Sequence, residues 1–196
     1  MPDYKQMSRE YLQLLQDTLA QLDLDALSRT MELLVQALEQ DRTIYIFGNG
    51  GSAATASHFQ NDFNKGISEY TNKKFRFNCL NDNVATLMAI ANDISYEEVF
   101  RFQLRGRIRP GDLVMAISGS GNSPNVLRAV EYAREQGNTI IGLTGMDGGK
   151  LKALSDVSLH APTMSMQVTE DVHMIFDHLM MAVLYKTLAG RDHVRR

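Results

Sequence analysis

Two pairs of histidine and carboxylate side chains are the residues of this chain best suited to moving protons or binding a metal. His58 and Asp62 are four residues apart, and Glu170 and His178 are eight apart. If each pair lies on a helix, its two members share one face. Imidazoles and carboxylates serve as general acids, general bases and zinc ligands, so the pairs predict a proton-transfer site or a metal site. Spacing alone leaves a solvated helix face as the alternative.

The other histidines, the cysteine and the methionines receive structural interpretations. His160 ends a predicted strand and His193 lies in the charged tail, and we interpret both as structural or surface residues. Cys79 lies in an apolar segment and is expected to be a small core residue, and the methionines of 164–181 are expected to fill irregular space rather than bind a cofactor. Chemistry is therefore expected from the two pairs.

A second feature is a pair of short segments rich in glycine, serine and asparagine. "GNGGS" at 48–52 follows one apolar run, and "SGSGNS" at 118–123 follows another. In a parallel sheet both turns would lie at the carboxyl ends of strands, where ligands of open α/β sheets bind. Small residues let a ligand approach the backbone, while serine hydroxyls and the first amides of the next helix donate hydrogen bonds. These turns predict a phosphate site.

The class of phosphate ligand follows from what the turns lack. Neither has the lysine of a P-loop, and the turn at 48–52 lacks the third glycine of a dinucleotide fingerprint. A phosphorylated small molecule is therefore favoured over a nucleotide. The second turn could also be a simple helix start, with Ser123 as N-cap and Pro124 in the first helical position. We expect Ser123 to serve both roles.

A parallel sheet with covering helices would position these residues. From residue 43 onward, short β-rich runs alternate with helical patterns, which is typical of a doubly wound fold. The fold class predicted is α/β, a three-layer arrangement with a five-stranded parallel sheet. Strands are expected at 43–47, 75–80, 113–117, 139–143 and 157–159, and helices at 51–65, 83–91, 96–107, 123–136, 150–154 and 167–189.

Long helices precede the sheet. Leucines recur at helical spacing between residues 6 and 40, with a break near Asp23 and Asp25, and Asp25 is a suitable N-cap for the second helix. So many leucines ahead of the first strand predict packing onto a partner subunit. We expect one domain over 1–196, with a helical extension at 1–40 and the α/β core at 41–196.

Composition excludes several partners. The net charge is -3 and no long Lys/Arg cluster occurs, so no direct contact with nucleic acid is expected. No apolar run approaches the ~20 residues that span a bilayer, and the amino-terminal residues are polar. A single cysteine excludes an internal disulfide. These features predict a cytoplasmic protein without a membrane partner.

The chain resembles the sugar isomerase (SIS) family, and within it the sedoheptulose 7-phosphate isomerases, also called phosphoheptose isomerases. The resemblance runs over nearly the whole chain. It is carried by "FGNGGSA" at 47–53, "HF" at 58–59, "AND" at 91–93, "RPGD" at 109–112, "SGSGNSPNVLRAVE" at 118–131, "IGLTGMDGGK" at 141–150 and "EDVHMIFDH" at 170–178.

The resemblance implies a flavodoxin-like sheet, a homotetramer, and exchange of an aldose and a ketose phosphate through an enediol. The implied substrate is sedoheptulose 7-phosphate, converted to D-glycero-D-manno-heptose 7-phosphate, or a close relative. Asp62 and His178 match the catalytic positions. The substrate-binding positions match Asn49, Gly50, Gly51, Ser52, Asn92, Asp93, Ser118, Gly119, Ser120, Ser123 and Glu170.

The resemblance also implies one zinc ion per subunit, bound by His58, Asp62, Glu170 and His178. Here the sequence departs from the family pattern twice. The family's catalytic glutamate is the shorter Asp62, and its glutamine is the charged Glu170. A shorter base opposite a longer acid would suit a related sugar phosphate, such as one used to build a surface polysaccharide.

Two non-catalytic functions compete with the isomerase. One relative of the family binds the bacterial replication initiator as a tetramer, but it lacks an acid at the Asp62 position and a histidine at the His178 position. Both are present here, which favours the enzyme. A module that binds a sugar phosphate without converting it is the other alternative, because a fold does not fix a function.

Overall fold

The computed structural model describes residues 1–192, and its centre is a five-stranded sheet in which all strand pairs are parallel. The strand order is β2-β1-β3-β4-β5. The strands are β1 (Ile44–Gly48), β2 (Phe77–Cys79), β3 (Leu113–Ser118), β4 (Thr139–Thr144) and β5 (Val157–His160). The predicted fold class is confirmed, and the sheet is the flavodoxin-like kind. His193 lies outside the described residues.

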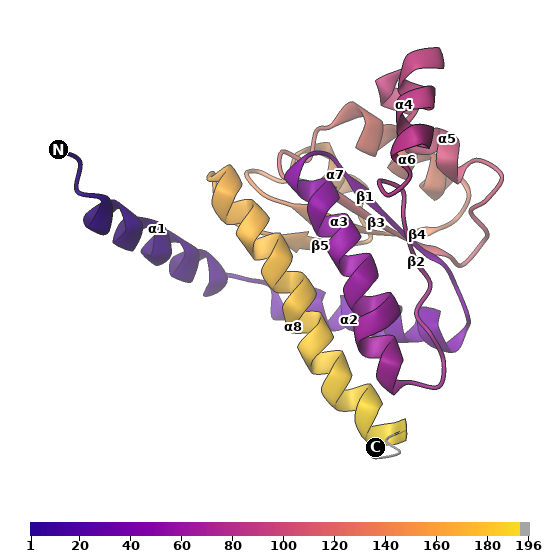
Figure 1. Ribbon diagram of the computed structural model, residues 1–196, viewed down its shortest axis with the longest axis horizontal. Coiled ribbons are helices and arrows are strands. Elements are labelled where there is room, and N and C mark those ends of the chain that lie inside the picture. Colours follow the sequence, from indigo (N-terminus) through magenta and orange to yellow (C-terminus); the bar gives the residue numbers. More distant parts are fainter. Residues whose placement is uncertain (193–196) are drawn as a thin grey trace.

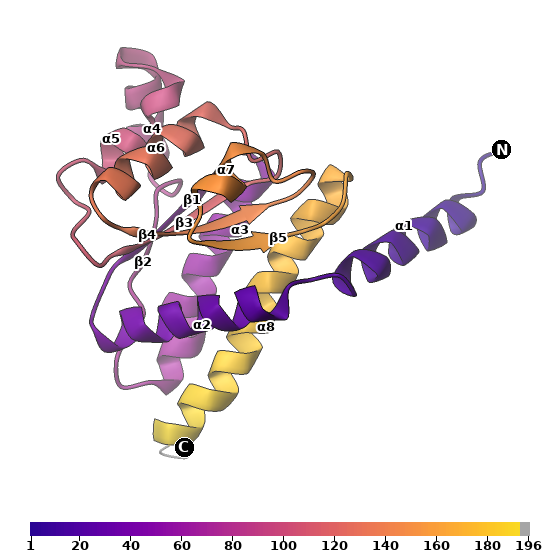
Figure 2. The ribbon, with the colours of Figure 1, turned by 180° about the vertical axis from the view of Figure 1, so that it is seen from behind.

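Helices cover both faces of the sheet, giving three layers (Figures 1 and 2). One face packs against α2 (Leu24–Glu39), α3 (Gly51–Asn61) and α8 (Met166–Asp192), and the other against α4 (Val84–Asp93), α5 (Arg101–Leu104), α6 (Pro124–Glu135) and α7 (Gly149–Leu154). Burial on both faces explains why β1 and β3 are apolar almost without a break. Cys79 is buried in the first of these cores, as predicted.

Two amino-terminal helices precede the sheet. Helix α1 (Tyr4–Leu19) projects from the rest of the molecule in both views, whereas α2 packs against the sheet (Figures 1 and 2). The N-cap of α2 is Asp23, whose carboxylate accepts hydrogen bonds from the amides of Asp25 and Ala26. The prediction of Asp25 as N-cap was therefore wrong, because the helix begins two residues earlier, at Leu24. The boundary predicted at residue 40 stays a prediction.

Two predicted helices differ from those observed. The helix expected at 51–65 ends at Asn61, and a π-helix takes over at Asp62–Gly66, followed by a 3-10 helix at Ile67–Tyr70. The helix expected at 96–107 divides into a 3-10 helix at Tyr96–Glu98 and the short α5. Hydrophobic spacing cannot separate these tighter and wider turns from an α-helix over so few residues. No helix among residues 1–192 is long and apolar enough to cross a membrane.

A buried histidine fastens α8 to the sheet. His173 is 1% exposed, and its Nε2–H donates to the carbonyl of Thr144 at the end of β4 over 3.1 Å. Burial lowers the pKa of His173 to about 4, since the charged imidazolium would lose its hydration. The neutral ring is therefore a pH-sensitive contact between α8 and β4.

We expect acid to weaken the fold through His173. Unfolded protein takes up a proton near pH 6.5 while the folded ring stays neutral to about pH 4. The free energy of unfolding should therefore fall by about 3 kcal/mol as the pH drops through this window. Urea titrations of wild type and His173→Gln at several pH values measure this loss. Glutamine can still donate to Thr144 but does not titrate, so an equally steep loss in the variant would contradict the assignment.

Candidate functional site

The two glycine-serine turns meet because β1 and β3 are neighbours. Gly48, the last residue of β1, is in register with Ile117 of β3. The strand order reverses between these two strands, which is where open α/β sheets leave a crevice at their carboxyl ends. A Cβ on Gly48 would collide with Ser52 and with the carbonyl oxygen of Ile117, so only glycine lets the turns approach this closely.

Two asparagines tie the turns together. Asn49 and Asn125 exchange two amide hydrogen bonds of 2.9 Å, each side chain donating to the other's oxygen. Asn125 is 2% exposed and also accepts a hydrogen bond from the amide of Val126. The hydroxyl of Tyr96 donates to Asn49 over 2.9 Å. Sequence reasoning missed Asn125 and Tyr96, since nothing in their spacing indicates that they meet Asn49.

The turn after β3 has the form of an oxyanion cradle. The hydroxyls of Ser118 and Ser123 lie 3.0 Å apart, and that of Ser120 accepts from the amide of Asn122. Ser123 occupies the N-cap of α6, and Pro124 is in the first turn, as predicted. However, the Ser123 side chain makes no capping hydrogen bond. That part of the prediction was wrong, because its hydroxyl pairs with Ser118 instead.

The turn after β1 begins α3. Gly50 is exposed with φ 55°, a conformation that favours glycine, and Ser52 is buried in the first helical turn. The carboxylate of Glu170, from the start of α8, lies so close to Gly51 that a Cβ there would collide with it. Glu170 thus lies at the turn. The predicted sugar contacts Asn92 and Asp93 are exposed on α4 and hydrogen-bond to each other over 2.8 Å.

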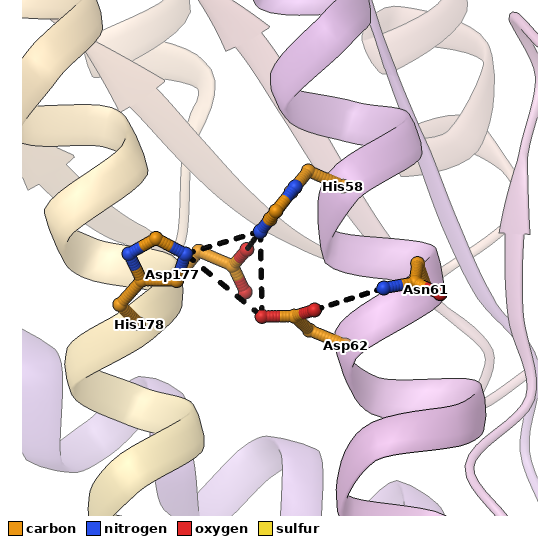
Figure 3. Close-up of polar contacts among 5 residues, drawn as sticks. All are labelled: His58, Asn61, Asp62, Asp177 and His178. Carbon is orange, nitrogen blue, oxygen red and sulfur yellow. Dashed lines mark hydrogen bonds and ion pairs between the residues drawn. The ribbon is translucent and has the colours of Figure 1, made fainter.

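Farther along α3 and α8, His58, Asp62 and His178 converge, whereas their spacing predicted only that each pair shares one face of its helix (Figure 3). The Nε2 atoms of His58 and His178 are 3.0 Å apart. An Asp62 carboxylate oxygen lies 3.4 Å from Nε2 of His58 and 4.0 Å from that of His178. Asp62 is the first residue of the π-helix, a local widening that often marks functional sites.

A fourth group, Asp177, points into this cluster and was not among the predicted site residues. One of its oxygens lies 3.8 Å from Nε2 of His58 (Figure 3). The side chain is 0% exposed, and neither oxygen has a hydrogen-bond partner among the described residues. Burial, and secondly the charge of Asp62, raise the pKa of Asp177 to about 8. An uncompensated buried carboxyl is costly, so its position calls for a ligand or a proton.

The donor atoms fit a tetrahedral metal. One ligand atom from each of His58, Asp62, Asp177 and His178 lies within 4.8 Å of all the others. Zinc bonds of about 2.0–2.1 Å would place tetrahedral ligands about 3.3 Å apart. Four of the six separations, at 3.0 to 4.0 Å, surround that value, and all six are within 4.8 Å. Two imidazoles and two carboxylates are an ordinary zinc donor set. Glu170 is not in this group, so its predicted metal role stays a prediction.

Comparison with known proteins gives consistent results. The family model described as the SIS domain matches residues 4–145. A phosphoheptose isomerase of Helicobacter pylori is 36% identical over 168 residues, which make up 86% of this chain and 87% of that protein. Another from Shewanella sp. (strain ANA-3) is 35% identical over 173 residues, 86% of each.

Solved structures agree with these relatives. The phosphoheptose isomerase GmhA of Neisseria gonorrhoeae has a TM-score of 0.83 and 32% identity, covering 93% of this chain and 96% of that one. A phosphoheptose isomerase from Francisella tularensis has a TM-score of 0.86, 24% identity and coverage of 95% and 100%. Because its identity is only 24%, the second similarity shows a shared fold alone.

The asparagine pair generates a prediction about stability. Asn125→Ala leaves the side chain of Asn49 and the amide of Val126 without their partner, which should lower the free energy of unfolding by about 1–3 kcal/mol. Urea unfolding measures the change. The control is Asn72→Ala, an exposed asparagine whose removal should cost less than about 0.5 kcal/mol. Equal midpoints for the two variants would show that the pair does not brace the turns.

Proposed function

This chain belongs to the SIS domain family, and from that membership we propose that it is a sugar-phosphate isomerase of the phosphoheptose type. The proposed reaction interconverts sedoheptulose 7-phosphate and D-glycero-D-manno-heptose 7-phosphate. The convergence of His58, Asp62 and His178 is the observation that carries the proposal, because it joins an acid and a base on two helices that begin beside the glycine-serine turns.

Asp62 and His178 have the chemistry to move the proton between neighbouring carbons. In the proposed mechanism the Asp62 carboxylate removes the proton from the carbon beside the carbonyl, while His178 donates a proton to the carbonyl oxygen, giving an enediol. Return of a proton to the other carbon, with loss of one from the other oxygen, completes the exchange. The side chain of Asp62 is 13% exposed and that of His178 is 56% exposed, so the base is the more sheltered of the two.

The turns would hold the phosphate end of the same substrate. Ser118, Ser120 and Ser123 supply hydroxyls, and the start of α6 adds the favourable end of its dipole. The hydroxyls are the main donors, because Pro124 has no amide hydrogen and the amide of Val126 already donates to Asn125. His58 lies seven residues beyond Gly51 on α3, which corresponds to about 10 Å along the helix axis. A phosphate held at the turns therefore suits a long sugar chain whose carbonyl end reaches the cluster.

The donor set supports a divalent ion, which we propose to be zinc, one per subunit. His58, Asp62 and His178 would hold it, with Asp177 in the place that the family pattern gives to residue 170. When bound to His178, such an ion would supply positive charge at the carbonyl oxygen in place of the proton that the metal-free imidazole donates. A fully buried Asp177 without a hydrogen-bond partner among the described residues supports this assignment, because positive charge would compensate its carboxylate.

The same proposal extends to assembly and location. We propose a homotetramer, since α1 exposes five large apolar side chains that a neighbouring copy could cover. These are Tyr4, Met7, Tyr11, Leu12 and Leu14. A cytoplasmic location is supported by a single, buried, unpaired cysteine.

The first test of the reaction is solvent exchange. In deuterium oxide, the purified protein should catalyse the incorporation of deuterium into sedoheptulose 7-phosphate at the carbon beside the carbonyl. NMR measures the rate of this incorporation. Asp62→Asn and His178→Ala should each slow exchange by at least about a hundredfold, since each removes a proton-transfer group. His160→Gln, which changes a histidine that pairs with Thr144 away from the cluster, is the control. Substrate binding without exchange in the wild type would favour the sensor alternative.

The second test concerns the metal donors. Zinc affinity, measured by competition with a chromophoric chelator, should fall at least about tenfold in Asp177→Asn, because lost support of metal ligands already costs roughly 10–100-fold. Glu170→Gln is the matched control and should keep its affinity. A loss of zinc affinity in Glu170→Gln but not in Asp177→Asn would show that Glu170, and not Asp177, binds the ion. If the wild-type protein binds no zinc, the metal proposal is wrong, but the deuterium-incorporation test of the isomerase remains valid.

A further inference from the structure

A cavity of about 410 Å³ lies at the amino ends of β1 and β3, at the opposite end of these strands from the glycine-serine turns. The strand β3 has six residues, so the two ends are separated by about 17 Å. A single phosphate cannot reach both places. The charged and aromatic side chains that line the cavity are Arg42, Arg76, Arg107, Arg109, Asp41, Asp112 and Tyr45.

The arginines of this cavity have few partners. Only Arg76 forms a salt bridge, 2.8 Å from Asp41. Arg42 donates through Nη1 to the carbonyl of Pro110, but its Nε is buried without a hydrogen-bond partner. The guanidinium groups of Arg107 and Arg109 make no salt bridge or hydrogen bond with any described residue. Three of the four cations are thus available to an anion.

The two acids of the cavity do not neutralise it. Asp112 is 4% exposed, and its oxygens accept hydrogen bonds from the amides of Thr43 at 3.0 Å and Arg109 at 2.8 Å. These backbone bonds occupy the carboxylate, while Asp41 is already paired with Arg76. Four guanidinium groups against two carboxylates leave an excess of two positive charges around one concave surface.

Tyr45 lies within the same positive field. The ring is 5% exposed, and its hydroxyl makes no hydrogen bond with a described residue. Burial, and secondly the charge of Asp112, raise the pKa of this phenol, while Arg107, Arg109 and Arg76 oppose the rise. The three guanidinium groups therefore lie close enough to act on one oxygen, although they come from different segments of the chain. An unpaired hydroxyl among them adds a neutral donor.

We propose that this cavity is a second anion site, which binds a small ligand carrying phosphoryl groups. A tetrahedral phosphate presents oxygens in several directions, which suits guanidinium groups that converge from three segments, whereas one carboxylate occupies a single fork. The volume lies within the range of small-molecule pockets. Because the site is remote from the acid-base cluster, its ligand is an effector or a second phosphorylated metabolite and is not the substrate under conversion.

The test uses inorganic pyrophosphate and the full chain at low ionic strength, where such contacts are least screened. Hydrogen-deuterium exchange locates the bound anion, and calorimetry gives its affinity. The variant is Arg107→Gln/Arg109→Gln. The matched control is Arg9→Gln/Arg105→Gln, which removes the same charge from exposed arginines outside the cavity. Both variants keep the serine turn and the histidine cluster, so binding there is common to both.

We expect pyrophosphate to slow exchange in the segments around 41–45 and 106–112 of wild type and control. The cavity variant should lose this protection, with an affinity at least about tenfold weaker. Protection confined to 117–126 in wild type, or equal protection of the cavity segments in both variants, would overturn the proposal. Without pyrophosphate, both variants should incorporate deuterium into sedoheptulose 7-phosphate at the same rate. The pyrophosphate result is a binding measurement, so it holds or fails independently of the proposed isomerase activity.

Discussion

Parallel pairing of β1 with β3 is the constraint on which the rest of the site depends. It places Gly48 beside Ile117 and so brings together two turns that are about 70 residues apart in the chain. The Asn49 and Asn125 side chains then lock the turns to each other. Helix α3 starts from the first turn, and α8 packs against α3 on the same face of the sheet. The acid-base cluster lies where these two helices meet, so its geometry follows from the strand order.

Sequence could predict the parts of this structure that have a local pattern. The alternation of strands and helices, the pair of glycine-serine turns, and the alignment of His58 with Asp62 all follow from periodicity or from small motifs. Asp177 could not be found this way, because neighbouring side chains on a helix point about 100° apart and the alignment of Glu170 with His178 did not include it. Only the packing of α3 against α8 shows that both side chains reach His58. Asn125 and Tyr96 were missed for the same reason.

Local energetics explain the errors near helix ends. Asp23 and Asp25 are equally good N-caps by residue type, and the choice between them depends on which carboxylate reaches the free amides. Ser123 has the right type and position for a cap, yet the hydroxyl of Ser118, brought to 3.0 Å by the tight turn, takes its hydrogen bond. The π-helix at Asp62 continues α3 along β2, where the side chain of Asn64 exchanges two hydrogen bonds with the backbone of Phe77, and no side-chain pattern predicts it.

Helix α3 also sets the distance between the glycine-serine turn and the histidine cluster. One end of it lies at the turn where the phosphate is proposed to bind, and His58 marks a fixed distance along the same rod. A sugar chain must span that distance to place its carbonyl at the cluster. Because a helix returns to the same face only after a full turn, this distance can be lengthened or shortened only in steps of about 5.4 Å. Relatives of this fold could therefore change the length of sugar they accept only in jumps, while smaller adjustments fall to single side chains such as the shortened Asp62.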